Sequence, residues 1–250
     1  MLKELGSFFD HYTINARFKP VFFSTLPFVL TMLAWCPISK SLLGGTLTVL
    51  ISFGVMTFIS TLISNLGNKC QDRLFSLWGE APTTIILRHS DKSIDKYTKQ
   101  RYHQWLSEKL GNFKLPSVEE EKNDPEDADS RYKSAINFLR EFTRNKEKYP
   151  AVYRDNVNYG FSRNLLAIRS FGVFISFFCV IANLSFLCAL FDYYQADVGT
   201  VELNANFFGI GAGFASVIFM AAFLFIVNKN FVRDRGFRYA KTLLESCELK

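Results

Sequence analysis

The chain has 250 residues, of which 49% are hydrophobic and 21% are charged, and its formal net charge is +6. Its mildly positive mean hydropathy is typical of a protein that is half membrane bundle and half polar domain. The five cysteines include no closely spaced pair of the metal-binding or redox type, which excludes a disulfide framework and a structural zinc site.

Four runs of the sequence lack charged residues for long enough to cross a bilayer, namely 20–39, 41–68, 170–191 and 203–228. An α-helix rises about 1.5 Å per residue, so about 20 apolar residues span a hydrocarbon core about 30 Å thick. Residues 1–19 contain no apolar stretch as long as that of a cleaved signal peptide, so the first run should be retained as structure. We therefore predict an all-α integral membrane protein with four transmembrane helices in two pairs.

The basic residues predict the topology, since Lys and Arg accumulate on the cytoplasmic side of membrane proteins. Of the 29 basic residues, 19 lie in 69–169 and six lie in the tail from Lys229, whereas the connection from Asp192 to Glu202 has none. We expect both termini and the domain between the second and third helices to be cytoplasmic. The expected parts are a cytoplasmic N-terminal segment (1–19), transmembrane helices 1 and 2 (20–68), a helical cytoplasmic domain (69–169), transmembrane helices 3 and 4 (170–228) and a basic cytoplasmic tail (229–250).

Helix starts can be recognised within the cytoplasmic domain. Ser93 is expected to cap one helix, and Ser117 with Glu120 three residues later resembles a capping box. Asp124 followed by Pro125 is a stronger start, because proline has no N–H to lose at the first helical position. The helix that follows has one apolar stripe and should pack on another element through Ala128, Tyr132, Ile136, Leu139 and Phe142.

No arrangement of residues predicts an enzyme. The acidic cluster from Glu119 to Asp129 lacks the alternating oxygen ligands and central glycine of a calcium loop, so a solvated acidic turn is the favoured interpretation. His11, His89 and His103 have no metal-ligand spacing. The sequence has no phosphate-binding glycine loop, nucleophile elbow or pair of catalytic carboxylates. We therefore expect no enzymatic activity and no cofactor.

Polar side chains of the second transmembrane helix recur three or four residues apart, which places them on one face. They are Thr57, Ser60, Thr61, Ser64, Asn65 and Asn68. Small polar residues often mediate helix packing in membranes. They also suit a water-filled pore, where water satisfies hydroxyl and amide groups. Both interpretations stay open here, and the second predicts that these six residues line a pore.

The third and fourth transmembrane helices carry candidates for helix packing. Gly209 and Gly213 are four residues apart and would let another helix approach closely. Asn183 needs a partner for its amide within the membrane, which predicts a helix contact or a water. The four uncharged runs and the lack of an internal repeat argue against a proton pump or an ion-coupled carrier.

Aromatic and basic residues alternate in two parts of the cytoplasmic domain. Lys and Arg neutralise phosphates and aromatic rings stack on bases, which indicates a nucleotide or nucleic-acid ligand. The candidate ligand-binding residues are Arg101, Tyr102, His103, Arg154, Tyr159, Arg163 and Arg169. The alternative is the ordinary accumulation of basic residues beside anionic lipid headgroups. The 19 basic residues of this domain face 15 acidic ones, so it is not a strongly basic module.

Several motifs of the cytoplasmic domain resemble the recurring pattern of a set of uncharacterised bacterial membrane proteins with four spans. They are Arg101-Tyr102-His103, Asp124-Pro125, Ala128-Asp129, Leu139-Arg140-Glu141 with Thr143-Arg144, and the run from Asn156 to Asn164. The last motif departs from the pattern, because Ser162 stands where two adjacent arginines are expected. A protein of this shape is similar to the membrane effectors of bacterial anti-phage systems, and most nearly to the channel subunit of the Hailong system.

That resemblance implies an oligomeric ion channel in the bacterial inner membrane that acts in abortive infection. It also implies a partner nucleotidyltransferase, whose nucleotide-derived or DNA product binds the cytoplasmic domain and holds the channel shut. Our preferred hypothesis is a homo-oligomeric channel, with a tetramer as the expected assembly, gated from the cytoplasm and opening to depolarise the membrane. The competing hypothesis is a non-conducting membrane scaffold that recruits a cytosolic partner. A small transporter ranks last.

Overall fold

The computed structural model describes residues 10–36, 42–196 and 203–248, and these ranges contain helices and no strand. Residues 1–9 of the expected N-terminal segment and residues 197–202 of the connection that lacks basic residues lie outside them. Four helices are long and apolar enough to cross a membrane, by length and composition. The prediction of an all-helical protein with four such helices is confirmed. The two-pair arrangement and the side of the membrane remain predictions.

The chain divides into two compact units. Residues 1–70 and 160–231 form the first, here called the membrane unit, and residues 71–159 and 232–250 form the second, here called the polar unit. The boundaries predicted from the sequence lie instead at residues 69, 169 and 229. Two consequences follow for the residues near these boundaries: residues 160–169 belong with the apolar helices, and most of the basic tail belongs with the polar unit.

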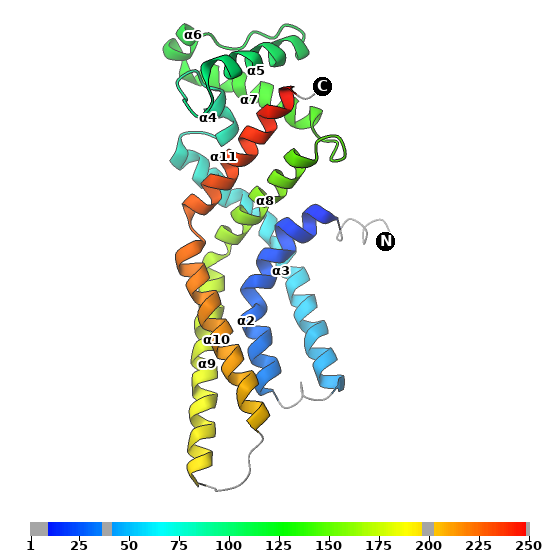
Figure 1. The fold of residues 1–250 in the computed structure, drawn as a ribbon, viewed down its shortest axis with the longest axis vertical. Helices are drawn as coiled ribbons and strands as arrows, with labels where there is room; N and C mark the ends of the chain where they lie inside the picture. Colours follow the sequence, from blue (N-terminus) through cyan, green and yellow to red (C-terminus); the bar gives the residue numbers. More distant parts are fainter. Residues whose placement is uncertain (1–9, 37–41, 197–202, 249–250) are drawn as a thin grey trace. The chain divides into compact units, whose positions relative to one another are not determined.

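The membrane unit is built from long helices that run side by side (Figure 1). Its elements are a short π-helix η1 (Thr13–Phe18), α2 (Lys19–Trp35), α3 (Leu42–Trp78) as far as Cys70, α8 (Pro150–Ala167) from Gly160, α9 (Arg169–Ala196), α10 (Leu203–Ala221) and a π-helical turn η3 (Ala222–Ile226). Helices α2, α9 and α10 pack on one another in all three pairings.

A buried amide joins two of these helices. The side chain of Asn183, on α9, is 1% exposed. Its Oδ1 accepts a hydrogen bond of 2.7 Å from the indole N–H of Trp35, and its Nδ2 donates to Thr31 Oγ1 at 2.9 Å and to the carbonyl of Cys179 at 2.7 Å. A buried amide without partners would cost several kcal/mol in a hydrocarbon surrounding, so this network fixes α2 against α9 in one register.

Two glycines of α10 lie against this network. A Cβ at Gly209 would overlap the indole ring of Trp35, which also stacks on Phe186 with centroids 5.1 Å apart. A Cβ at Gly213 would lie 3.5 Å from the Cβ of Asn183, which is ordinary van der Waals contact. The two positions therefore differ, since only Gly209 must be glycine for α10 to approach the ring.

The polar unit contains α4 (Pro82–Leu87), α5 (Lys96–Lys109), α6 (Val118–Asn123), α7 (Pro125–Phe142), the start of α8, α11 (Lys229–Glu245) from Val232, and a 3-10 turn η4 (Ser246–Glu248). One apolar core joins them, and it includes residues of α11 and the turn after it. The buried members are Ile86, Leu87, Tyr102, Leu106, Ala128, Tyr132, Ala135, Ile136, Leu139, Tyr149, Val152, Ala240, Leu243, Leu244 and Cys247.

Two of the three helix caps predicted for this unit are confirmed. Ser117 and Glu120 form the predicted capping box at the start of α6, and Asp124 caps α7 ahead of Pro125. The cap predicted at Ser93 is wrong: Asp95 accepts the hydrogen bond from the N–H of Thr98 and α5 begins after it. A carboxylate two residues further on competes with the serine because it is the stronger acceptor.

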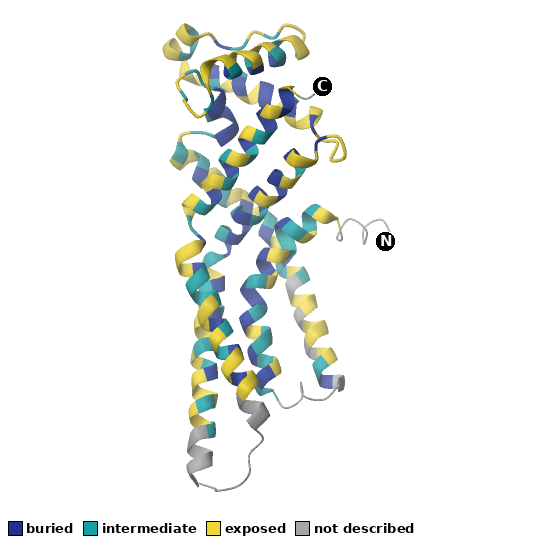
Figure 2. Ribbon diagram, viewed as in Figure 1, coloured by how far each residue is buried: buried dark blue, intermediate teal, exposed yellow. Residues whose placement is uncertain are grey.

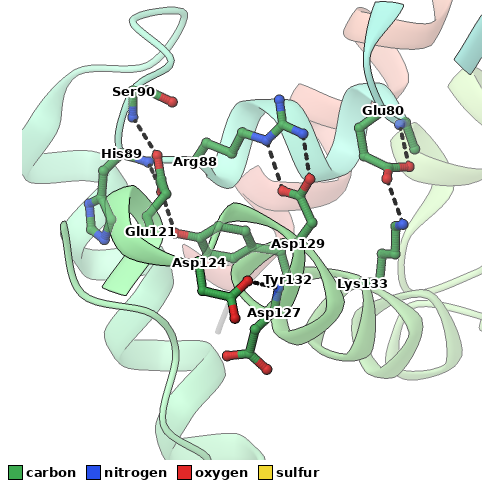
Figure 3. Close-up of polar contacts among 11 residues, drawn as sticks. Glu80, Arg88, His89, Ser90, Glu121, Asp124, Asp127, Asp129, Tyr132 and Lys133 are labelled. Carbon is green, nitrogen blue, oxygen red and sulfur yellow. Dashed lines mark hydrogen bonds and ion pairs between the residues drawn. The ribbon is translucent and has the colours of Figure 1, made fainter. Parts of the chain in front are cut away.

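Helix α7 is held along its polar face by two ion pairs (Figure 3). Arg88 donates two hydrogen bonds to the carboxylate of Asp129, at 2.8 and 2.5 Å, and this ion pair raises the pKa of Arg88. Lys133 pairs with Glu80. Because α7 packs on the core through its apolar stripe, these pairs fix the segment from Glu80 to Arg88 along its polar face.

Glu121 ties α6 to the loop after α4 (Figure 3). Its carboxylate accepts hydrogen bonds from the backbone N–H of His89 at 2.7 Å, the N–H of Ser90 at 3.1 Å and the hydroxyl of Tyr132 at 2.8 Å. Burial disfavours the charged carboxylate, but these hydrogen bonds outweigh it and lower the pKa of Glu121 below its ordinary value.

The glycine contact in the membrane unit can be tested by adding one methyl group. Gly209→Ala should destabilise the protein in detergent by about 1–3 kcal/mol, because the new Cβ overlaps the ring of Trp35. Gly211→Ala, two residues away on the same helix with nothing within 4 Å of the added Cβ, is the matched control and should be neutral or slightly stabilising. Equal melting temperatures for the two variants would contradict the packing described.

The Glu121 network predicts a pH-dependent contribution to stability. Because the folded-state pKa is lowered, this contribution is present above the ordinary carboxyl pKa and is lost as pH falls through the folded-state value. Glu121→Gln should lower the free energy of unfolding by about 1 kcal/mol at neutral pH, a figure reduced for the partial exposure of the side chain. Thermal unfolding of both proteins across the acidic range should show the difference shrinking, while Glu119→Gln, an exposed carboxylate on the same helix, should show none. A difference that does not change with pH would sink the electrostatic explanation.

Candidate functional site

Helix α3 is the element with the most unusual surface. It runs without a break over 37 residues from Leu42, because nothing in that sequence interrupts it, and it ends at Trp78 before Gly79, whose φ is +89°. Many apolar side chains between Leu47 and Leu66 are exposed (Figure 2). They are Leu47, Val49, Leu50, Ile51, Phe53, Val55, Phe58, Leu62 and Leu66.

One narrow face of α3 packs on the membrane unit. Ser60, Ile63 and Gly67 are buried on it, and Ile63 packs against Val21 of α2 and Ile168. A Cβ at Gly67 would overlap the amide of Asn164, so α3 approaches α8 closely at this point. The Nδ2 of Asn164 donates to the carbonyl of Ala16 at 2.6 Å, which ties α8 to η1 as well.

The predicted pore-lining residues lie mostly beside this packing face rather than on it. Ser60 is buried at 3% exposure. Thr57 and Ser64 are half-buried, and Thr61, Asn65 and Asn68 are exposed. With about 100° per residue, the five other than Ser60 centre roughly 110° around the helix from the packing face. Helix α3 therefore has a polar face directed away from its own bundle.

The hydroxyl and amide groups of this polar face differ in how they are satisfied. Thr57 donates to the carbonyl of Phe53 at 2.8 Å and Thr61 donates to that of Phe58 at 2.6 Å, so both hydroxyls bond to their own helix. Within the described part of the chain, Ser64, Asn65 and Asn68 make no side-chain hydrogen bond. An amide side chain has two N–H donors and one oxygen acceptor. Carbonyl groups one turn away on the same helix do not satisfy all of them, so these amides need water or another chain.

The predicted ligand residues of α5 are not equally accessible. Arg101 is exposed and pairs with Glu248 at 2.8 Å, which connects α5 to the C-terminal turn. Tyr102 is 3% exposed in the core, and burial is the first cause that raises its pKa to about 12. His103 bonds the carbonyl of Leu87, and burial lowers its pKa to about 4. At neutral pH His103 is therefore uncharged, and neither ring offers a free face to a base.

The remaining candidates are divided between the two units. In the polar unit Arg154 is exposed, whereas Tyr159 is buried, donates to Gln71 Oε1 at 3.1 Å and stacks on Tyr239. In the membrane unit Arg163 lies half-buried against α3 beside Gly67. The seven candidate residues therefore do not form one site within either unit.

Arg169 closes an irregular turn at the end of α10. Its guanidinium donates to the carbonyls of Phe223 and Leu224, both at 2.9 Å. These carbonyls belong to the π-helical turn η3, whose wider winding leaves carbonyl groups free to accept other donors. A cation at the C-terminal end of a helix is also favoured by the helix dipole. Arg169 therefore has a structural function, since it ties the start of α9 to the turn that follows α10.

Sequence reasoning missed two features of possible function. Trp35 was not singled out, although it is the partner of Asn183, because its spacing along the chain gives no sign of a contact 148 residues away. The second is a polar hollow of about 280 Å³ in the polar unit, lined by Asp155, Asn158, Asp234, Arg235 and Arg238. These residues lie in two expected parts of the sequence and only the fold brings them together. No cluster of His, Cys, Asp and Glu suited to a metal ion occurs among the described residues.

The chain matches no protein-family model, and no curated protein and no solved structure is significantly similar to it. Function must therefore be argued from the geometry of this chain.

Proposed function

We propose that the protein is a homo-oligomeric ion channel in which the polar face of α3 lines the pore and the polar unit controls opening. The observation that carries this proposal is the pair of exposed amides, Asn65 and Asn68, on a helix with an uncharged stretch long and apolar enough to cross a membrane. A polar face of this kind is costly against lipid and stable against water.

The other apolar helices treat their polar residues differently, which supports the proposal. In α2 the hydroxyl of Thr31 is buried and donates to the carbonyl of Pro27 at 2.8 Å. In α10 the hydroxyl of Ser216 is buried and donates to the carbonyl of Ala212 at 2.8 Å. In α9 the amide of Asn183 is buried with all its partners named above. Helix α3 differs from these examples, because Thr61, Asn65 and Asn68 are exposed and lie off its packing face.

One chain cannot enclose a pore with this helix, because its polar face points away from the helices it packs on. Copies of α3 related by rotation about an axis can do so, and closed cyclic symmetry is usual among homo-oligomers. The packing face through Ile63 and Gly67 would then hold α3 to its own bundle while the polar face meets the axis. A tetramer is the assembly we propose.

The resemblance of the polar-unit motifs adds the biological setting. A channel of this kind in the inner membrane of a bacterium would depolarise the cell when opened, as an effector of anti-phage defence. A nucleotide-derived or nucleic-acid ligand from a partner nucleotidyltransferase would act on the polar unit. The proposal includes no enzymatic activity.

Conductance should depend on the polar face of α3. Each of the variants Thr61→Leu, Ser64→Leu and Asn65→Leu should reduce ion flux through the purified protein in a planar bilayer by about tenfold or more. The reason is that a constriction lined by leucine loses its water. Val55→Leu places the same residue on the opposite, exposed apolar face and should conduct like the wild type.

The outcome of this experiment separates the channel from a scaffold. Wild-type flux together with unaltered flux in all three polar-face variants would show that α3 does not line the pore. No flux from the wild-type protein, combined with a monomer in detergent, would favour the non-conducting scaffold, because a single polar face cannot enclose a channel.

The orientation in the membrane is a second expectation of the proposal. In a chain whose native cysteines are replaced, Asn123→Cys at the end of α6 should react with a membrane-impermeant maleimide only after the cells are permeabilised. Gln195→Cys, near the end of α9, should react in intact cells. Labelling at position 123 from outside intact cells would reverse the topology and remove the cytoplasmic gate.

A further inference from the structure

The hollow between α8 and α11 has the chemistry of an anion site. Helix α8 contributes Asp155 and Asn158, and α11 contributes Asp234, Arg235 and Arg238. Residues three apart lie on one face of a helix, so each helix presents two of these side chains to the same side. The residues that line the hollow are all polar or charged, and they lie wholly within the polar unit.

The two helices approach closely at this place. A Cβ at Gly236 would lie 3.3 Å from Tyr159 and from Pro82, so there is just room for a glycine. One residue pair further along, Tyr159 and Tyr239 stack with an interplanar angle of 3°. These contacts fix the backbone beside the hollow, and its polar side chains therefore start from a rigid frame.

The charges of the hollow are not equally compensated. Both carboxylate oxygens of Asp155 already accept hydrogen bonds, one from Thr242 at 2.7 Å and the other from Arg154 at 3.3 Å. Within the described residues no carboxylate lies at ion-pair distance from Arg238. Burial first, and the positive charge of Arg238 second, lower the pKa of Arg235, while the carboxylate of Asp234 raises it. Arg238 is therefore the arginine of the hollow whose charge has no carboxylate at ion-pair distance within the described residues.

A cation would find poorer partners here. Asp155 is already engaged and Asp234 stands between two arginines in the sequence, so no pair of free carboxylates faces the hollow. Guanidinium groups, in contrast, match the oxygens of a phosphate with two parallel hydrogen bonds. The amide of Asn158 can add a donor.

We propose that the hollow between α8 and α11 is a binding site for a phosphate group, held by Arg235, Arg238 and Asn158. Its volume of about 280 Å³ lies at the small end of ligand pockets, so it suits a phosphate or pyrophosphate group better than a large organic ligand. A soluble phosphate compound and a lipid headgroup carry the same chemistry. Such a site would give the polar unit of the proposed channel its ligand, so in that respect it rests on the proposed function.

The test uses the full-length protein in a neutral detergent and inorganic pyrophosphate as the probe, with binding measured by calorimetry. Binding is measured without ion flux, so this site and the pore can fail separately. Arg238→Gln should weaken binding about tenfold or more, because it removes one charged donor pair. Asp234→Asn should strengthen binding, because it removes a carboxylate that repels the anion.

Arg233→Gln is the matched control, since Arg233 lies on the same helix, packs over the ring of Phe237 and does not line the hollow. It changes net charge by the same amount as Arg238→Gln and should leave affinity unaltered. Circular dichroism of each variant would show that the helices are intact.

A second arm separates the two sources of phosphate. The protein is placed in vesicles of phosphatidylcholine with or without phosphatidic acid, and its melting temperature is measured. A stabilisation by phosphatidic acid that Arg238→Gln abolishes and Arg233→Gln does not would assign the site to a lipid headgroup, whereas pyrophosphate binding with no such effect would assign it to a soluble ligand. Equal weakening by Arg233→Gln and Arg238→Gln, or no binding in either arm, would overturn the site.

Discussion

The amide of Asn183 is a strongly polar group inside an apolar bundle, and the membrane unit is arranged around the need to satisfy it. Its partners come from α2, where Trp35 and Thr31 lie one turn apart, and the indole that serves it also occupies the space left by Gly209 on α10. Hydrogen bonding thus fixes α2 on α9, and ring packing fixes α10 on both. Helices α2, α9 and α10 therefore form the core of the bundle without α3.

This closure explains why α3 has so much exposed surface. It is attached through one narrow face, at Ile63 and Gly67, and its remaining surface is apolar on one side and polar on the other. In water such a helix would collapse onto its neighbours, but in a membrane the apolar side is satisfied by lipid. The polar side is not, and its amides, which make no side-chain hydrogen bond within the described part of the chain, are the physical reason to place water or other copies of the chain there.

In the polar unit, by contrast, nearly every residue that the sequence suggested for ligand binding already has a partner within the unit. Among the motif residues, Asp124 caps α7, Ala128 is buried in the core and Asp129 binds Arg88. On α5, Tyr102 is buried in the core and His103 is hydrogen-bonded to the carbonyl of Leu87. What these residues leave for a ligand is the hollow between α8 and α11, where two arginines of the same helix face lie beside an amide and a carboxylate that is already bonded. Recognition would therefore depend on a pairing of helices rather than on any single motif.

The sequence alone determined the helical class, the four apolar helices and the starts of α6 and α7, because uncharged length and capping residues act locally. It also placed the polar residues of α3 on one face, since spacing is enough for that. It could not tell that Ser60 belongs to the packing face, that Asn183 meets Trp35, or that residues of the C-terminal tail complete the core of the polar unit. Those contacts join residues far apart in the chain, and only tertiary packing decides which polar groups are satisfied internally and which remain for water, a ligand or another copy.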